Sequence, residues 1–218
     1  MAEMRTEEET VQAIKDWWKN NGSSLLIGIA AALAIVFGWQ AWQNHQMQQR
    51  TEAASQFADL INAYSDESDE KRAETVAYVA ESLREEYSDS AFAIYGMLML
   101  ARQQMMDQGD PQAAIESLSW AQEKAGDSGP LALVIRNRLA RAHFAAEQYE
   151  EALARIENVE DAGTFSAIFT ELKGDILLAQ GDRDGARDAY LAAREQNQQG
   201  RSGILELKLS DLGVGEGA

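Results

Sequence analysis

The residues best suited to metal binding or proton transfer are few in this chain. It has no cysteine and two histidines, His45 and His143. Neither histidine has a second histidine at the spacing of a zinc site. The sequence contains no P-loop, no dinucleotide-binding motif and no Gly-x-Ser-x-Gly motif. We therefore expect no catalytic residue, no bound metal and no cofactor.

Carboxylates are abundant, but their pattern is that of a solvated surface. The chain has 36 acidic and 19 basic residues, for a formal net charge of −17. Pairs such as Glu150 and Glu151 are ordinary in helices this acidic. The segment SDESDE (65–70) lacks the glycine and the terminal glutamate of an EF-hand loop, so it predicts weak calcium binding at most. An enzyme built from scattered carboxylates is the less favoured hypothesis.

One segment is strongly apolar: SLLIGIAAALAIVFGWQAW (24–42), nineteen residues without a charge. As a helix it spans roughly 28 Å, close to the ~30 Å hydrocarbon core of a bilayer. It exceeds the apolar region of a signal peptide. We expect a transmembrane helix at 23–43, which is the part of the chain that contacts membrane lipid. The anchor residues are Leu25, Gly28, Ala32, Phe37, Trp39 and Trp42.

Basic residues flank this span on one side. Lys15 and Lys19 precede it, whereas the first basic residue after it is Arg50. The positive-inside rule then places the N-terminus in the cytosol of a single-pass protein of the inner (cytoplasmic) membrane. Residues 44–218 would lie in the periplasm of a Gram-negative bacterium.

Residues 1–22 form a short cytosolic amphipathic segment. Thr6 and Glu9 have the spacing of a capping box, which predicts a helix that ends near Asn20. The sequence leaves two interpretations open, an interfacial helix that leads into the anchor and a docking site for another protein.

The region 44–218 is acidic and helical. It carries 31 acidic and 16 basic residues, a formal charge of −15, so nucleic acid is excluded as a partner. Only two prolines occur, and helix-forming residues dominate. We expect one all-α domain.

Three segments repeat a common pattern. Ala152 and Ala186 are thirty-four residues apart, and Ala114 precedes Ala152 by thirty-eight. The 34-residue period and the small residues resemble the tetratricopeptide signature. Repeat packing is assigned to Ala114, Ala152, Gly174, Ala186 and Tyr190. In this register Met105 and His143 take the place of a core tyrosine, and Arg136 replaces a tryptophan.

Helices on both sides extend these repeats. Residues 52–64 and 70–87 form an expected helical pair, and 203–212 an expected cap for the last repeat. The sequence therefore predicts a transmembrane helix followed by a tetratricopeptide-repeat-like α-solenoid.

The chain resembles the YfgM family over nearly its whole length. The resemblance rests on AIKDWWKNNG (13–22) directly before the apolar span, on LARQQMMDQGDPQAAIESL (100–118) and on LKGDILLAQGDRDGARDAY (172–190). It implies a non-enzymatic ancillary subunit of the SecYEG translocon. It also implies association with a PpiD-like periplasmic chaperone and with exported polypeptides, which the protein helps to pass to periplasmic chaperones. The alternative is a tethered scaffold for envelope assembly or signalling, unrelated to secretion.

Overall fold

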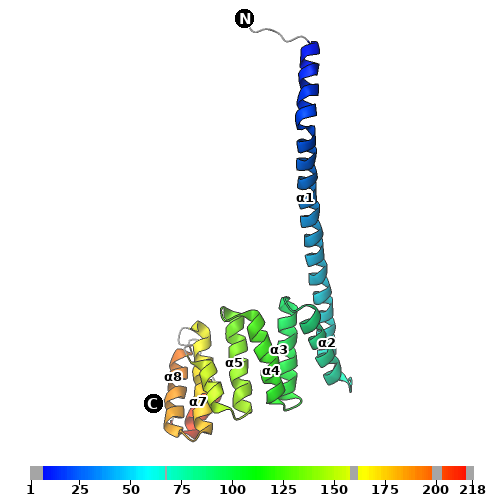
Figure 1. Ribbon diagram of the computed structural model, residues 1–218. Helices are drawn as coiled ribbons and strands as arrows, with labels where there is room; N and C mark the ends of the chain where they lie inside the picture. The colour runs from blue at the N-terminus through cyan, green and yellow to red at the C-terminus, as the bar shows by residue number, and fades with distance from the viewer. Residues whose placement is uncertain (1–6, 67, 158–161, 198–202, 215–218) are drawn as a thin grey trace. The chain divides into compact units, whose positions relative to one another are not determined.

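A computed structural model describes residues 7–66, 68–157, 162–197 and 203–214. Over these ranges the chain is helical, without a strand. It divides into two compact units, Met1–Glu52 and Ala53–Ala218. The prediction of an all-α chain with one long apolar helix is confirmed (Figure 1).

Helix α1 runs from Glu7 to Ser65, so the prediction of a helix that ends near Asn20 was wrong. The Asn21 amide donates to the backbone carbonyl of Trp17 at 3.0 Å, and the Trp18 ring lies against Gly22. Both contacts join residues four apart, which is the spacing of neighbours on a helix. Thr6, the expected N-cap, lies outside the described residues.

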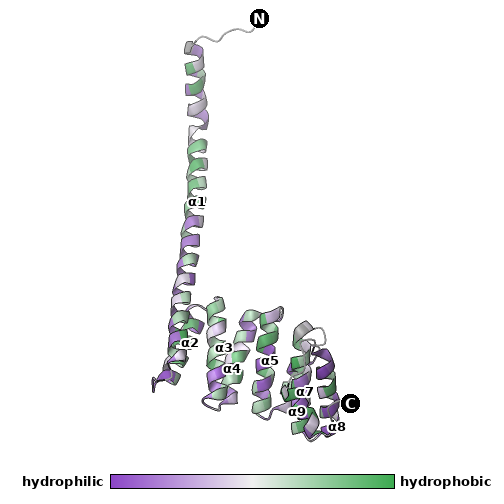
Figure 2. Cartoon of the chain, turned by 180° about the vertical axis from the view of Figure 1, so that it is seen from behind, coloured by the Kyte–Doolittle hydropathy of each residue, from purple (hydrophilic) through white to green (hydrophobic). Residues whose placement is uncertain are grey.

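The apolar part of α1 has little protein to pack against. Leu26, Phe37 and Trp39 are 56%, 63% and 61% exposed. Figure 2 shows this stretch as a hydrophobic band along the helix. It is the one described helix that is long and apolar enough to cross a membrane. A helix that is apolar on all sides and uncovered by protein fits a lipid environment.

The second unit is a row of antiparallel helices in which neighbours in sequence pack side by side (Figure 1). The end of α1 and α2 precede three helical pairs, α3 with α4, α5 with α6, and α7 with α8. The bounds are α2 Arg72–Glu86, α3 Ala91–Met106, α4 Pro111–Ala125, α5 Pro130–Ala145, α6 Tyr149–Ile156, a 3-10 turn Gly163–Phe165, α7 Ser166–Ala179, α8 Arg183–Gln196 and α9 Gly203–Asp211.

The turns within the pairs have clear local causes. Asp110 caps α4 by accepting from the Ala113 N–H at 3.0 Å, with Pro111 following it in the first turn. Gly181 supplies a positive φ of 89° between α7 and α8. The equivalent residue between α5 and α6 is Glu147 at φ 59°, a conformation that disfavours most side chains.

Small and apolar residues fill three successive cores of the solenoid. The first joins the end of α1 to α5, the second α5 to α7, and the third α7 to α9. In the third, Leu205 and Leu209 of α9 pack with Tyr190. Helix α9 thus covers the apolar side of the last pair, as a solenoid cap does.

Candidate protein-binding surface

The small residues of the repeats lie at the contacts between helices. Ala114, Ala152 and Ala186 are completely buried in α4, α6 and α8. Ala140 of α5 and Gly174 of α7 are also buried. Each lies twelve residues before the alanine of the second helix of its pair, Ala152 or Ala186. Small side chains let the paired backbones approach closely, and so they set the spacing of the solenoid.

Gly174 and Tyr190 form the tightest of these contacts. A Cβ atom added to Gly174 would lie 2.4 and 2.5 Å from two carbons of the Tyr190 ring. Carbon atoms that are not bonded to each other do not approach so closely. Tyr190 itself is only 1% exposed. The glycine therefore makes room for the aromatic ring that joins α7 to α8.

The register of the first pair is shifted by one residue from the predicted one. Four residues separate α3 from α4, whereas three separate the helices of each later pair. Gln104 rather than Met105 therefore matches the position of His143. Gln104 accepts a hydrogen bond from the Ser117 hydroxyl at 2.8 Å, and Met105 packs beside the core. His143 is buried, with its Nδ1 2.7 Å from the Gln148 side-chain oxygen.

The corrected register places six side chains at equivalent positions of the first helices of the three pairs, and all but Val134 and Asp175 are exposed. One row consists of Tyr95, Val134 and Ile168. Tyr95 and Ile168 are each 42% exposed, and Val134 is half-buried. The second row contains two cations and an acid. We call these six residues the α3–α5–α7 face: Tyr95, Val134, Ile168, Arg102, Arg141 and Asp175. Its apolar row and charged row suit an extended polypeptide.

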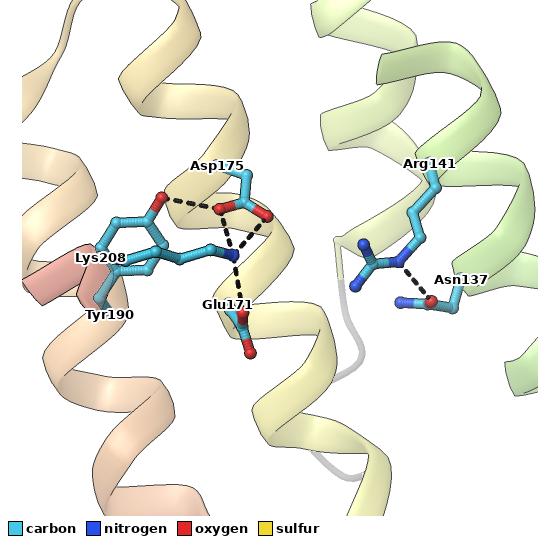
Figure 3. A network of polar contacts seen from close by, with 6 residues as sticks. All are labelled: Asn137, Arg141, Glu171, Asp175, Tyr190 and Lys208. Atoms are coloured by element: carbon cyan, nitrogen blue, oxygen red, sulfur yellow. Dashed lines mark hydrogen bonds and ion pairs between the residues drawn. The ribbon is translucent and has the colours of Figure 1, made fainter. Parts of the chain in front are cut away.

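A polar network lies where this face meets the cap (Figure 3). The Lys208 ammonium of α9 lies 2.7 Å from the carboxylates of both Glu171 and Asp175 on α7. Asp175 also accepts from the Tyr190 hydroxyl at 2.7 Å. On α5, the Arg141 guanidinium donates to the Asn137 side chain. The cap is thus held by ion pairs as well as by apolar contacts.

Sequence reasoning missed Lys208 and the network around it. Asp175 lies in the recognised repeat and Glu171 directly precedes it, but Lys208 follows the last recognisable alanine, so the repeat pattern gave it no role. One hint of this packing was Gly174, which has no side chain and leaves room for the Tyr190 ring sixteen positions later.

Burial raises the pKa of the Tyr190 hydroxyl, and the hydrogen bond to Asp175 raises it further. The folded state therefore keeps this proton more tightly than the unfolded state. Well below pH 10, the ordinary pKa of tyrosine, both states hold the proton, and the stabilisation is complete. Above that pH the unfolded chain loses it first, so the free energy of unfolding falls until the folded pKa is passed.

We therefore expect the stability advantage of the wild type over Tyr190→Phe to shrink from about pH 9 to about pH 11. Phenylalanine keeps the ring but removes the titrating hydroxyl. Urea unfolding at each pH measures the difference. An advantage that stays constant over this range would contradict the assigned environment of Tyr190.

The structure also locates the other residues of interest. Leu25, Gly28, Ala32, Phe37, Trp39 and Trp42 all lie exposed on α1. The rings of Trp39 and Trp42 are 5.1 Å apart. Within the described ranges, no group of three or more metal-ligating side chains comes together.

The chain is similar to known proteins over nearly its full length. A family profile described as a tetratricopeptide repeat-like domain matches residues 15–214. A relative from Haemophilus influenzae is 29% identical over 97% of this chain and 100% of its own length. One from Escherichia coli is 26% identical over 95% and 97%, and one from Neisseria gonorrhoeae 27% identical over 97% and 100%. Each of the three is named an ancillary SecYEG translocon subunit.

Proposed function

Because this chain belongs to the tetratricopeptide repeat-like family, as its resemblance to YfgM proteins predicted, we propose that it is a non-enzymatic ancillary subunit of the SecYEG translocon. The observation that carries the proposal is the match to relatives of that name along both the apolar helix and the solenoid. In this proposal the protein acts by its position beside the translocon and by binding other proteins.

In this proposal the apolar part of α1 holds the protein in the inner membrane beside the translocon. Residues 1–22 lie in the cytosol, 23–43 cross the membrane, and 44–218 lie in the periplasm. Lys15 and Lys19 before the span support this orientation. The exposed apolar side chains of α1 support its placement in lipid.

The solenoid then binds protein partners through the α3–α5–α7 face. These partners are a PpiD-like periplasmic chaperone and exported polypeptides, which the protein helps to pass on to periplasmic chaperones. Tyr95 and Ile168 offer exposed apolar contacts. The negative charge of 44–218 opposes binding to nucleic acid and leaves proteins as the expected partners.

The orientation can be tested with single cysteines, because the natural chain has none. Gln12→Cys lies before the span, and Ser128→Cys lies exposed in the solenoid. We expect a membrane-impermeant maleimide to label Ser128→Cys but not Gln12→Cys in cells with a permeabilised outer membrane. Lysed cells, in which both must react, are the control. Labelling of Gln12→Cys alone would reverse the proposed topology.

The partners can be tested by affinity capture of the full-length protein from solubilised membranes. We expect the wild type to recover SecYEG and a PpiD-like chaperone. A face variant, Tyr95→Ser with Ile168→Ser, should lose the chaperone and keep SecYEG. The matched control is Tyr78→Ser, which removes another exposed tyrosine, on α2. Recovery of neither partner by the wild type would refute the proposal and leave a scaffold role outside secretion.

A further inference from the structure

A pocket of about 220 Å³ lies among α4, α5 and α6, and its chemistry differs from that of the surrounding acidic domain. It lies outside the α3–α5–α7 face, because none of the six face residues lines it. Its lining residues are Gln122, Asp127, Ala132, Leu133, Arg136, Ala154 and Arg155.

Two half-buried arginines supply its positive charge. Arg136 donates to the backbone carbonyls of Arg155 and Glu157 at the end of α6, and this holds its guanidinium in place. Arg155 donates to the Gln122 side-chain oxygen at 3.3 Å. Among the described residues neither guanidinium forms an ion pair with a carboxylate. Two guanidinium groups that form no ion pair with a described carboxylate favour an anionic ligand in this pocket.

The rest of the lining narrows the class of anion. Gln122 links Arg155 to Asp127, whose carboxylate accepts from the Gln122 amide at 3.2 Å. The Asp127 charge repels a doubly charged phosphate more than a singly charged carboxylate. Ala132, Leu133 and Ala154 add apolar surface beside the arginines. A carboxylate with a small apolar group next to it satisfies both parts of the lining.

We propose that this pocket binds a carboxylate of a partner polypeptide, with Arg155 and Arg136 holding the carboxylate and Leu133 contacting the adjacent apolar group. Planar guanidinium groups match the geometry of a carboxylate. The carboxylate belongs either to a chain terminus or to an aspartate or glutamate side chain. The site is a second point of contact for a protein partner, and it rests on the proposed function only in that the ligand is a polypeptide.

The test is a titration of the full-length protein in lipid nanodiscs, followed by methyl NMR. The methyl groups of Ala132, Leu133 and Ala154 line the pocket and report directly on its occupancy. Acetyl-Ala-Leu with a free carboxylate probes a chain terminus, and acetyl-Ala-Glu amide probes an acidic side chain. Acetyl-Ala-Leu amide and inorganic phosphate are the controls. No translocon component takes part, so failure here is separate from failure of the proposed function.

We expect saturable shifts of the three methyl groups with at least one carboxylate peptide, and the responding peptide identifies the source of the carboxylate. Arg155→Met removes a charge but keeps an apolar stem, and it should weaken binding by about tenfold. Arg138→Met, which replaces an exposed arginine of α5 that does not line the pocket, is the control and should bind normally. If Arg155→Met fails to fold, Ala154→Leu fills the pocket without changing its charge and should abolish the shifts of the Ala132 and Leu133 methyl groups.

Three results would overturn the proposal. The first is the absence of methyl shifts with either carboxylate peptide at millimolar concentration. The second is equal binding of the neutral amide, or tighter binding of inorganic phosphate. The third is unchanged peptide binding by a folded Arg155→Met protein.

Discussion

Replacing Gly174 with valine is expected to lower the free energy of unfolding by about 3 kcal/mol, at the upper end of the usual cost of overpacking. The first carbon of the new side chain would lie 2.4 Å from the Tyr190 ring. The ring cannot move aside easily, because it is packed against Leu205 and Leu209, and its hydroxyl is bound to Asp175. One of the two helices must therefore shift.

Urea unfolding of the full-length protein, followed by helical circular dichroism, measures this cost. Gly203→Val is the matched control, since a Cβ at that helical glycine meets no atom within 4 Å. The double variant Gly174→Val with Tyr190→Leu should cost less than the sum of the two single changes, because the smaller side chain relieves the collision. Strictly additive costs would show that the collision is not the cause.

Replacing Ala186 with leucine is expected to cost about 2 kcal/mol, and Ala152→Leu should cost about as much, again through overpacking. Both alanines are completely buried, and they lie in different cores of the solenoid. Ala179→Leu, which adds the same atoms at an exposed position of α7, is the control and should change stability by less than about 0.5 kcal/mol.

The same urea experiment measures these variants. Unchanged stability in both Ala152→Leu and Ala186→Leu would mean that these positions do not set the distance between paired helices. The assignment of the 34-residue repeat to helix packing would then be wrong.

The fold was predictable because it depends on residues that repeat. Ala114, Ala152 and Ala186 recur where antiparallel helices touch, and that contact requires a small side chain wherever it occurs. The apolar span was predictable because a long apolar helix without charged residues is stable in few environments other than a membrane. The continuity of α1 was not, because Asn21 and Gly22 usually mark a helix end, whereas in the structure both lie inside the helix and contact Trp17 and Trp18.

The polar features were harder to predict, since each depends on a pairing that occurs once. Arg136 departs from the signature, which prefers tryptophan at that position, and the sequence gives no reason for it. In the structure its guanidinium binds the carbonyl groups at the end of α6. Lys208 likewise gains its role only when α9 places it between Glu171 and Asp175. Such contacts do not recur at a fixed spacing in the sequence, so no repeat pattern predicts them.

The division of the solenoid into three successive cores also determines how the domain loses its structure. Each core joins helices that are neighbours in sequence, so stability is distributed along the chain as in a one-dimensional array. The pairs at the two ends can then open independently of each other. A substitution at Gly174 should accordingly lower protection against amide hydrogen exchange more in α7 to α9 than in α2 to α4. We expect damage in one repeat to leave its distant neighbours folded.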